Sequence, residues 1–280
     1  MCEECGCGLP GPTKIDGKPM HQEAHAHPHT HDHDHGHEHG HGHDHPHDHD
    51  HAHGHSHAHH EHGTREVAVH ESLFAANDRR AERNRGFFEG LGLLALNVVS
   101  SPGSGKTTLL TRTIERLAGR TRVGVIVGDL ETDNDAKRLR AVGAPVVQVS
   151  TGTLCHLDAE MVGEALKNLD AKALDVLIIE NVGNLVCPAQ FDLGEALRVV
   201  LLSVTEGEDK PLKYPPIFRS ADAVVVTKTD LVPYLDYDHD QALANIRRVS
   251  PEARVFEISA RTGAGMDEWC DFLLGAKAPV

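Results

Sequence analysis

The chain has few aromatic residues, no long hydrophobic run and fewer basic than acidic side chains. Its 27 Lys and Arg residues stand against 42 Asp and Glu, a formal net charge of −15. An acidic chain without a basic cluster is a poor candidate for binding nucleic-acid phosphates. No apolar stretch approaches the roughly 18 residues of a transmembrane helix, and the first residues lack the apolar core of a signal peptide. We therefore expect a soluble cytoplasmic protein with neither nucleic acid nor membrane as a partner.

Histidine, in contrast, is abundant and confined to one segment. Of the 24 histidines, 21 lie between residues 21 and 62, where they alternate with Asp, Gly, Ala, Pro and Glu. With almost no apolar side chains, this segment cannot offset the entropy cost of ordering and is expected to be disordered. Neutral imidazole binds Ni, Cu, Zn and Co, so we interpret the segment as a transition-metal store that empties below about pH 6. An expression tag and a solvated tail without a metal role are the alternatives.

Three cysteines, Cys2, Cys5 and Cys7, lie within six residues at the N-terminus. Thiolates on so short a loop can converge on one soft or borderline metal ion. With the α-amino group of Met1 as fourth ligand, a planar site would favour Ni²⁺ over Zn²⁺. A redox-active C-x-x-C pair or an incidental tail is the alternative.

The segment from Ser100 to Thr108 follows an apolar run and precedes a helix-forming stretch, the order that a phosphate-binding loop requires. Backbone N–H groups of the turn and the positive end of the helix would hold the β-phosphate. Lys106 would reach the β and γ oxygens, and the Thr107 hydroxyl would bind Mg²⁺. Ser100 replaces the first glycine of the usual pattern. An ordinary strand-to-helix turn is the alternative.

Two acidic segments follow buried strands and are expected beside the nucleotide. Asp129 and Asp133 come after the strand predicted at 122–128, and either would serve the Mg²⁺ shell or sense the γ-phosphate. Helix N-capping by Asn134 or Asp133 is equally compatible with the pattern. Glu180 ends the next buried strand, and Gly183 follows three places later, as in the turn that senses the γ-phosphate.

Two segments carry further metal-binding residue types. Cys155 and His156 are adjacent at a helix start expected at Asp158, where they form either half of a metal site or a buried thiol and a satisfied imidazole. Cys187 lies four residues after Gly183, so metal binding there would be coupled to the nucleotide state.

A third group of motifs indicates guanine selectivity. Thr227-Lys228-Thr229-Asp230 ends a buried strand and resembles the N-K-x-D turn, in which Asp230 would accept hydrogen bonds from guanine N1 and N2. Ser259-Ala260-Arg261 ends a later strand and resembles the S-A-K turn that supports guanine O6. We assign Trp269 and Cys270 to the core and the polar residues of the helix predicted at 65–89, including Asn77, Arg79, Arg80 and Arg83, to a solvated face.

Together these residues resemble the HypB family, the nickel-incorporation GTPases of nickel-iron hydrogenase maturation. The resemblance rests on the N-terminal cysteines, the His-rich tract, residues 100–108, Cys155-His156 and the segment from Glu180 to Pro188. It implies a high-affinity Ni²⁺ site at Cys2, Cys5 and Cys7, and a Ni²⁺ or Zn²⁺ site at Cys155, His156 and Cys187 where two subunits meet. It also implies a homodimer favoured by GTP, and as partners the hydrogenase maturation proteins and the precursor of the hydrogenase large subunit.

The sequence thus predicts a disordered Cys/His-rich N-terminal region followed by an α/β phosphate-loop NTPase domain with a mostly parallel sheet flanked by helices. We expect slow, Mg²⁺-dependent GTP hydrolysis coupled to nickel storage and delivery. A nickel or zinc buffer with a regulatory GTPase domain and a GTP-dependent protein-targeting factor are the alternatives. The expected parts are 1–20 (Cys-cluster tail), 21–62 (His-rich store), 63–92 (linker and helix) and 93–280 (GTPase domain). The expected catalytic residues are Lys106, Thr107, Asp129, Glu180 and Gly183, and the expected nucleotide-binding residues are Gly103, Ser104, Gly105, Lys106, Thr107, Thr108, Lys228, Asp230, Ser259 and Ala260.

Overall fold

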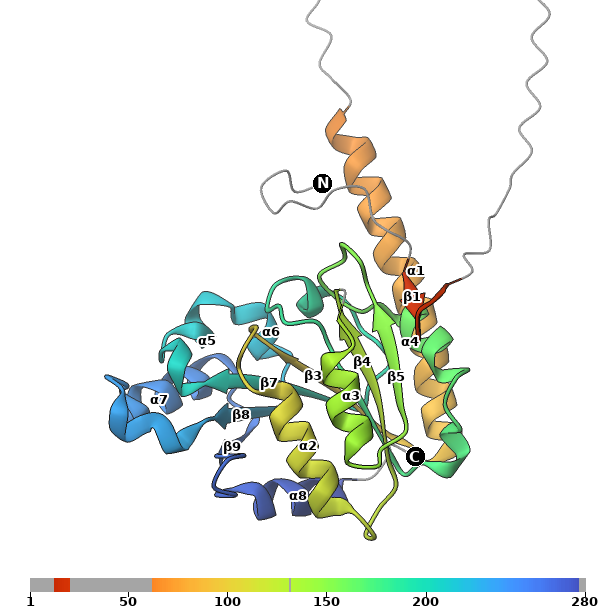
Figure 1. The fold of residues 1–280 in the computed structure, drawn as a ribbon. Helices are drawn as coiled ribbons and strands as arrows, with labels where there is room; N and C mark the ends of the chain where they lie inside the picture. The colour runs from red at the N-terminus through yellow and green to blue at the C-terminus, as the bar shows by residue number, and fades with distance from the viewer. Residues whose placement is uncertain (1–12, 21–61, 131, 277–280) are drawn as a thin grey trace, which may run out of the picture.

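A nine-stranded sheet forms the centre of the molecule, with strands in the order β2-β1-β5-β4-β6-β3-β7-β8-β9 (Figure 1). The computed structural model describes residues 13–20, 62–130 and 132–276, and for 62–72 the backbone alone. The predictions for Cys2, Cys5, Cys7 and most of the His-rich tract therefore lie outside the described residues. From β5 to β9 all pairs are parallel. The predicted fold class, a mostly parallel sheet flanked by helices, is confirmed.

The central strands β3, β4, β6 and β8 are buried almost along their whole length because helices cover both faces of the sheet. One face packs on α2, α3 and α8, and the other on α1, α4, α6 and α7. Trp269 and Cys270 of α8 are buried, as predicted. The strands are β1 (Lys14–Ile15), β2 (Lys18–Pro19), β3 (Leu94–Ser100), β4 (Val123–Asp129), β5 (Val146–Ser150), β6 (Val176–Glu180), β7 (Leu197–Ser203), β8 (Ala223–Thr227) and β9 (Arg254–Ile258). The helices are α1 (His62–Leu91), α2 (Lys106–Leu117), α3 (Asn134–Ala141), α4 (Ala159–Leu166), α5 (Lys210–Lys213), α6 (Pro215–Arg219), α7 (His239–Val249) and α8 (Met266–Gly275).

The parallel register brings the predicted site segments to one edge of the sheet. Strand β3 lies between β6 and β7, and Val98 of β3 pairs with Glu180 at the end of β6. Strand β4 is the other neighbour of β6 and ends at Asp129. Because parallel strands all end at the same edge, the loops after β3, β4, β6 and β8 are gathered there.

A short hairpin extends the sheet at β5, which the sequence did not predict. Strands β1 and β2 pair with each other, and β1 pairs antiparallel with β5, with Lys14 opposite Ser150. Ile15 is buried against the core, and Asp16 accepts a hydrogen bond from Arg140. Residues 13–20 thus belong to the edge of the sheet.

Helix α1 is attached to the domain by two buried asparagines. Asn77 Oδ1 accepts a hydrogen bond from Ala159 N at 3.0 Å, and its Nδ2 donates to Asp192 O at 2.8 Å. Asn84 Nδ2, two turns later, donates to Ala159 O and Leu193 O. The assignment of Asn77 to a solvated face is therefore wrong, because its amide holds backbone groups that would otherwise be buried without partners. The three arginines predicted with it, Arg79, Arg80 and Arg83, are exposed.

Replacing Asn77 with alanine is expected to lower the free energy of unfolding by about 2 kcal/mol, because it leaves Ala159 N–H and Asp192 C=O buried without a partner. Urea denaturation followed by circular dichroism measures this change. Arg79→Ala, two residues away on the exposed face, is the matched control and should stay within about 0.5 kcal/mol of the original chain. Equal free energies of unfolding for the two variants would contradict the role of Asn77 as a buried hydrogen-bond partner of Ala159 and Asp192.

The segment 206–220 contains two short helices, α5 and α6. Each has proline in its first turn, Pro211 as the second residue of α5 and Pro215 as the first residue of α6. Proline has a fixed φ that suits the first helical turn, where its missing N–H is not needed. Both prolines are therefore compatible with the helices in which they lie.

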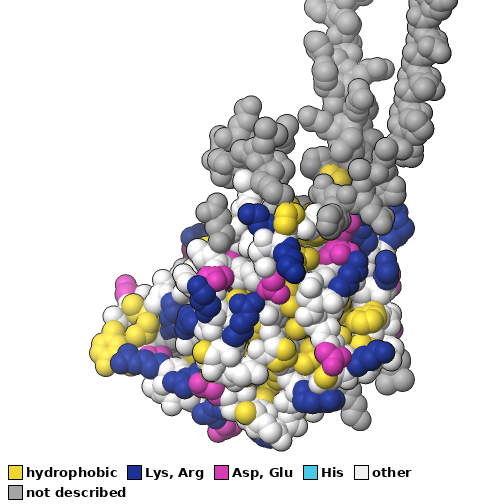
Figure 2. All heavy atoms as spheres, turned by 45° about the vertical axis from the view of Figure 1, so that its right-hand side comes forward, with side chains coloured by type: hydrophobic (Ala, Val, Ile, Leu, Met, Phe, Trp, Pro, Cys, Tyr) yellow, Lys and Arg dark blue, Asp and Glu magenta, His cyan; other side chains and the backbone are white. Residues whose placement is uncertain are grey.

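The surface in Figure 2 shows Lys and Arg side chains interspersed with acidic and hydrophobic ones (Figure 2). On the described part of this face, basic side chains do not form one continuous stripe. None of the described helices is both long and apolar enough to span a membrane. The absence of a nucleic-acid partner stays a prediction.

Candidate functional site

The loop between β3 and α2 has the geometry of a phosphate-binding turn. Gly103 and Gly105 have φ values of 75° and 97°, which glycine adopts without strain. Gly105 directly precedes α2, so the first N–H groups of that helix point into the loop. A phosphate placed there meets N–H donors and the positive end of the helix dipole.

Lys106 is the cation of this loop and is mostly shielded from solvent. Its Nζ donates to Ser100 Oγ at 2.8 Å, so the serine that replaces the usual glycine holds the lysine in place. Burial lowers the pKa of Lys106, and the nearby carboxylates of Glu180 and Asp135 oppose that shift. A phosphate would provide the negative charge that this partly desolvated cation needs.

Glu180 lies against Thr107 at the centre of the predicted Mg²⁺ site. Thr107 Oγ1 donates to Glu180 Oε1 at 2.8 Å, while Glu180 Oε2 is buried and has no partner in the described part of the chain. Burial raises the pKa of Glu180 to about 7, against the opposing effects of Lys106 and Thr107. A hydroxyl beside a carboxylate oxygen without a partner suits Mg²⁺, which prefers oxygen ligands.

The three aspartates at the end of β4 and the start of α3 have different environments. Asp129 accepts hydrogen bonds from Leu130 N and Thr132 Oγ1, both at 2.6 Å. Asp133 occupies the N-cap position of α3 without a side-chain cap, and its carboxylate pairs with Lys137 at 2.8 Å. Asp135, which the sequence analysis did not select, acts on the charges of both Lys106 and Glu180. Asp135 and Asp129 are thus partly buried carboxylates close enough to influence Lys106 and Glu180, whereas Asp133 is an exposed helix-end residue.

The turn 180–183, called the sensing turn below, packs directly on the phosphate loop. A Cβ atom at Gly183 would lie 3.1 Å from Pro102 Cα and 3.2 Å from Pro102 N. A side chain there would push the two backbones apart, so glycine is needed for this close approach. Any group that displaces the phosphate loop therefore also displaces the sensing turn.

The motif at the end of β8 is bonded to the phosphate loop. Thr227 Oγ1 donates to Ser104 O at 2.7 Å, and Lys228 Nζ donates to Gly103 O at 2.7 Å. Thr227, which replaces the Asn of the usual pattern, thus makes a bond to the loop through its hydroxyl. Lys228 has a φ of 61°, a left-handed conformation that is uncommon outside glycine.

A cavity of about 210 Å³ separates this motif from the loop after β9. Asp230 lies on its wall and accepts a hydrogen bond from Ser259 Oγ at 2.6 Å. Ala260 and Arg261 line the other side. The carboxylate of Asp230, the stem of Lys228 and the turn at Ala260, which line this cavity, are the groups predicted from the sequence to bind a guanine base.

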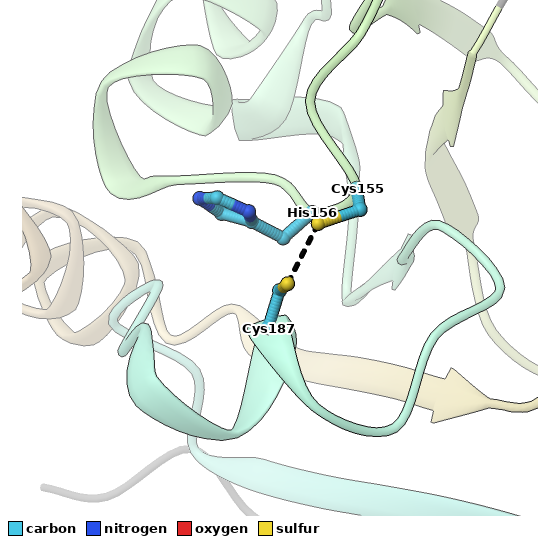
Figure 3. A group of neighbouring side chains, drawn as sticks. All are labelled: Cys155, His156 and Cys187. Carbon is cyan, nitrogen blue, oxygen red and sulfur yellow. Dashed lines mark hydrogen bonds between the residues drawn. The ribbon is translucent and has the colours of Figure 1, made fainter. Parts of the chain in front are cut away.

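Cys155, His156 and Cys187 lie together, with one ligand atom of each within 4.8 Å of the others (Figure 3). The sulfurs of Cys155 and Cys187 are 2.6 Å apart. All three residues are partly buried and come from one chain, two from the loop 151–158 and one from the start of the 3-10 turn Cys187–Gln190. We call them the Cys/His cluster. Two thiols and an imidazole are the ligands that Ni²⁺ and Zn²⁺ share.

His156 is held in place by an aromatic neighbour. Its ring stacks on Phe191 with centroids 3.9 Å apart, and its Nδ1 is buried without a hydrogen-bond partner among the described residues. Burial lowers the pKa of His156, which favours the neutral imidazole that binds metal. Phe191 in turn contacts Phe74 of α1. The roles of Phe191 and Phe74 could not be predicted from the sequence, because the ring contacts from His156 to Phe191 and from Phe191 to Phe74 join segments far apart in the chain.

Residues 94–257 match the CobW/HypB/UreG nucleotide-binding domain. The hydrogenase maturation factor HypB of Azotobacter vinelandii is 57% identical over 206 residues, which cover 74% of this chain and 68% of that protein. The HypB of Escherichia coli K12 is 52% identical over 209 residues, covering 75% and 72%. The crystal structure of HypB from Helicobacter pylori in complex with nickel matches with a TM-score of 0.68 at 41% identity, over 71% of this chain and 94% of that one.

Proposed function

The chain belongs to the HypB family of hydrogenase maturation factors, and from that premise we propose that it is a GTP-hydrolysing nickel metallochaperone. In this proposal it stores nickel and delivers it to a hydrogenase precursor through other maturation proteins, and GTP changes the affinity of the Cys/His cluster for the metal. The HypB of Helicobacter pylori has been crystallised with nickel, and two thiols with an imidazole are a suitable ligand set for that ion or for Zn²⁺.

One observation carries the proposal. Gly183 is in close contact with Pro102 of the phosphate loop. Cys187 lies four residues after Gly183, and its sulfur is 2.6 Å from that of Cys155. A short segment thus contacts the nucleotide site at one end and the Cys/His cluster at the other. A γ-phosphate that draws the sensing turn inward would change the position of one metal ligand relative to the other two.

The residues around Glu180 fit a magnesium ion. Thr107 and Glu180 would hold it, since Glu180 Oε2 has no partner in the described part of the chain. When bound, Mg²⁺ supplies positive charge to the phosphate oxygens. Lys106 would hold an oxygen between the β- and γ-phosphates, and Gly183 would offer its N–H to the γ-phosphate. Hydrolysis is proposed to be slow, since we assign neither an arginine nor a glutamine to the attacking water.

Replacing Asp230 with asparagine is expected to lower the affinity for GTP by about 100-fold, because one of the two acceptors for the guanine N1 and N2 donors becomes a donor. Xanthosine triphosphate, which has an oxygen at C2, should bind the variant better than GTP does. Fluorescence titration with labelled nucleotides measures both affinities. Asp236→Asn, a change of the same charge outside this cavity, is the matched control. Unaltered base preference would remove Asp230 from the base site.

The proposed function is tested by nickel binding in two nucleotide states. The full chain carrying Cys2→Ser, Cys5→Ser and Cys7→Ser is titrated with Ni²⁺, and the thiolate charge-transfer absorption reports the remaining cluster. The nickel affinity is expected to differ by at least about fivefold between GDP and a slowly hydrolysed GTP analogue. Cys155→Ala should abolish the band. The same affinity in both states would exclude the coupling, and an unchanged band in Cys155→Ala would exclude the site.

The homodimer is proposed as the form that GTP favours, with the Cys/His cluster near the contact between subunits. Sedimentation of the chain with GDP and with the GTP analogue tests this part separately. The proposal predicts a heavier species with the analogue. A monomer in both states would leave nickel binding within one chain and remove the dimer from the account.

A further inference from the structure

The side chain of Asn181 lies where the sensing turn meets the loop 151–158. Its Oδ1 accepts hydrogen bonds from Leu157 N at 3.0 Å and from Val182 N at 2.9 Å. Leu157 directly follows His156, and Val182 directly precedes Gly183. One oxygen atom therefore joins the backbone that carries two residues of the Cys/His cluster to the backbone that contacts the phosphate loop.

The other end of the same amide is also bonded. Asn181 Nδ2 donates to Asn97 Oδ1 at 3.2 Å, and Asn97 Nδ2 donates to Glu195 Oε1 at 3.1 Å. Glu195 Oε2 accepts a hydrogen bond from Leu193 N, in the segment that follows Cys187 and Phe191. Asn97 belongs to β3, which leads into the phosphate loop. The hydrogen-bonded side chains thus connect both segments of the Cys/His cluster to the strand beneath the nucleotide.

These hydrogen bonds can couple the two segments because the side chains that make them are buried. Asn181 and Asn97 are 1% and 0% exposed, and Glu195 is 8% exposed. Water does not reach Asn181 Oδ1, so a displaced turn must either carry Leu157 with it or leave a buried N–H without an acceptor. The direct chain connection from Gly183 to Cys187 runs instead through Val186, which is 55% exposed. That path moves the backbone at Cys187 and meets Cys155 only through the contact between their two sulfurs, at 2.6 Å, whereas Asn181 bonds the backbone of the loop 151–158 itself.

We infer that Asn181 is the positioning residue through which the sensing turn moves Leu157, and with it Cys155 and His156, when the nucleotide changes. The inference rests on the proposed function, since it assigns the coupling to one side chain. The hydrogen bonds of the Asn181 side chain go to protein groups, Leu157 N, Val182 N and Asn97 Oδ1. It acts by holding two backbone N–H groups on one oxygen, so that the nucleotide state sets the position of two metal-binding residues.

Asn181→Ala is tested in the full chain with Cys2→Ser, Cys5→Ser and Cys7→Ser. The ratio of nickel affinities between the GTP-analogue and GDP states is expected to fall to within about twofold of one, from at least about fivefold in the parent. The variant should still show the thiolate band, because both thiols remain. Asn84→Ala, which removes two buried hydrogen bonds at Ala159 and Leu193, is the matched control and should keep the parent ratio.

The outcomes separate this inference from the function on which it rests. If the parent has equal nickel affinity in both states, the proposed function fails. If the parent shows coupling and Asn181→Ala keeps it, the inference is overturned. The coupling would then run through the start of the loop, where Thr151 N and Gly152 N donate to Asp129 O and Leu130 O.

A measurement on the unmodified chain covers the case in which Asn181→Ala does not fold. Amide hydrogen exchange at Leu157 is expected to change by at least about fivefold between the GDP and GTP-analogue states, because its acceptor moves with the sensing turn. The amide of Met161 in α4, which donates to the carboxylate of the N-cap residue Asp158, should exchange at the same rate in both states. Equal exchange at Leu157 in both states would overturn the inference.

Discussion

Replacing Lys106 with alanine is expected to lower kcat for GTP hydrolysis by about 100-fold or more, since removing one preorganised charge from a transition state costs on that order. Lys106 donates to Ser100 Oγ and lies beside Glu180 in the phosphate loop. The ammonium of Lys106 is partly desolvated before any nucleotide binds, which costs free energy in the folded state. Removing it in Lys106→Ala should therefore lower the stability of the fold only slightly. Phosphate release under saturating GTP measures the rate, and thermal unfolding checks the fold.

Lys137→Ala is the matched control for this variant. Lys137 is exposed and pairs with Asp133 at 2.8 Å, and such a solvent-screened surface pair adds little to stability. The control should hydrolyse GTP as the original chain does. If Lys106→Ala retained a third of the original rate, the loop would not be the catalytic phosphate site.

Replacing Glu180 with glutamine is expected to stabilise the nucleotide-free protein while lowering Mg²⁺-dependent hydrolysis by about 100-fold or more. Burial raises the pKa of Glu180 to about 7 from an ordinary value of 4.5. Each pKa unit corresponds to about 1.4 kcal/mol, so the buried carboxylate costs up to about 3 kcal/mol at neutral pH or above. Glutamine keeps the oxygen that Thr107 needs and removes the charge.

The pH dependence of stability follows from the sign of this shift. Between pH 4.5 and about 7 the unfolded chain releases the Glu180 proton and the folded protein keeps it, so stability falls with rising pH. Below pH 4.5 the two chains should be equally stable, and above about pH 7 the gain of Glu180→Gln should be complete. Urea denaturation without nucleotide at pH 5 and pH 8 measures the difference. An equal effect at both values would contradict the buried carboxylate as its cause.

The main features of the fold could be predicted from the sequence because they depend on local patterns. The buried strand ending at Glu180 and the helix start at Asp158, whose carboxylate accepts a hydrogen bond from Met161 N, follow from apolar runs and capping residues. The hairpin 13–20 could not be predicted, because its strands have two residues each and gain stability only by pairing with β5. The helices α5 and α6 have only four and five residues, too few to show a helical pattern of apolar residues.

The residues of the candidate site could be predicted from the sequence, but their arrangement in space could not. Gly103, Gly105 and Lys106 occur in one short motif, the loop 100–108, so their phosphate-binding roles could be predicted from their spacing alone. Cys155 and Cys187 are 32 residues apart, and their grouping in the sequence analysis rested on resemblance to a family. Asn77 and Asn181 were missed because their partners are distant backbone groups, which no local pattern records. The structure adds the hydrogen bonds that connect the motifs.

These contacts give the proposed coupling a physical route in both directions. The phosphate loop holds the sensing turn at Gly183, and the sensing turn reaches the Cys/His cluster through Cys187 and Asn181. If the nucleotide changes nickel affinity by a given factor, nickel must change nucleotide affinity by the same factor. A measurement of nucleotide affinity with and without nickel therefore also reports whether the metal site is coupled to the nucleotide site.

The most direct test of the account is the affinity of the full chain, with Cys2→Ser, Cys5→Ser and Cys7→Ser, for a slowly hydrolysed GTP analogue, measured with and without saturating Ni²⁺. The account predicts that nickel changes this affinity by at least about fivefold and that Cys187→Ala removes the effect. An analogue affinity that nickel leaves unchanged would contradict the account.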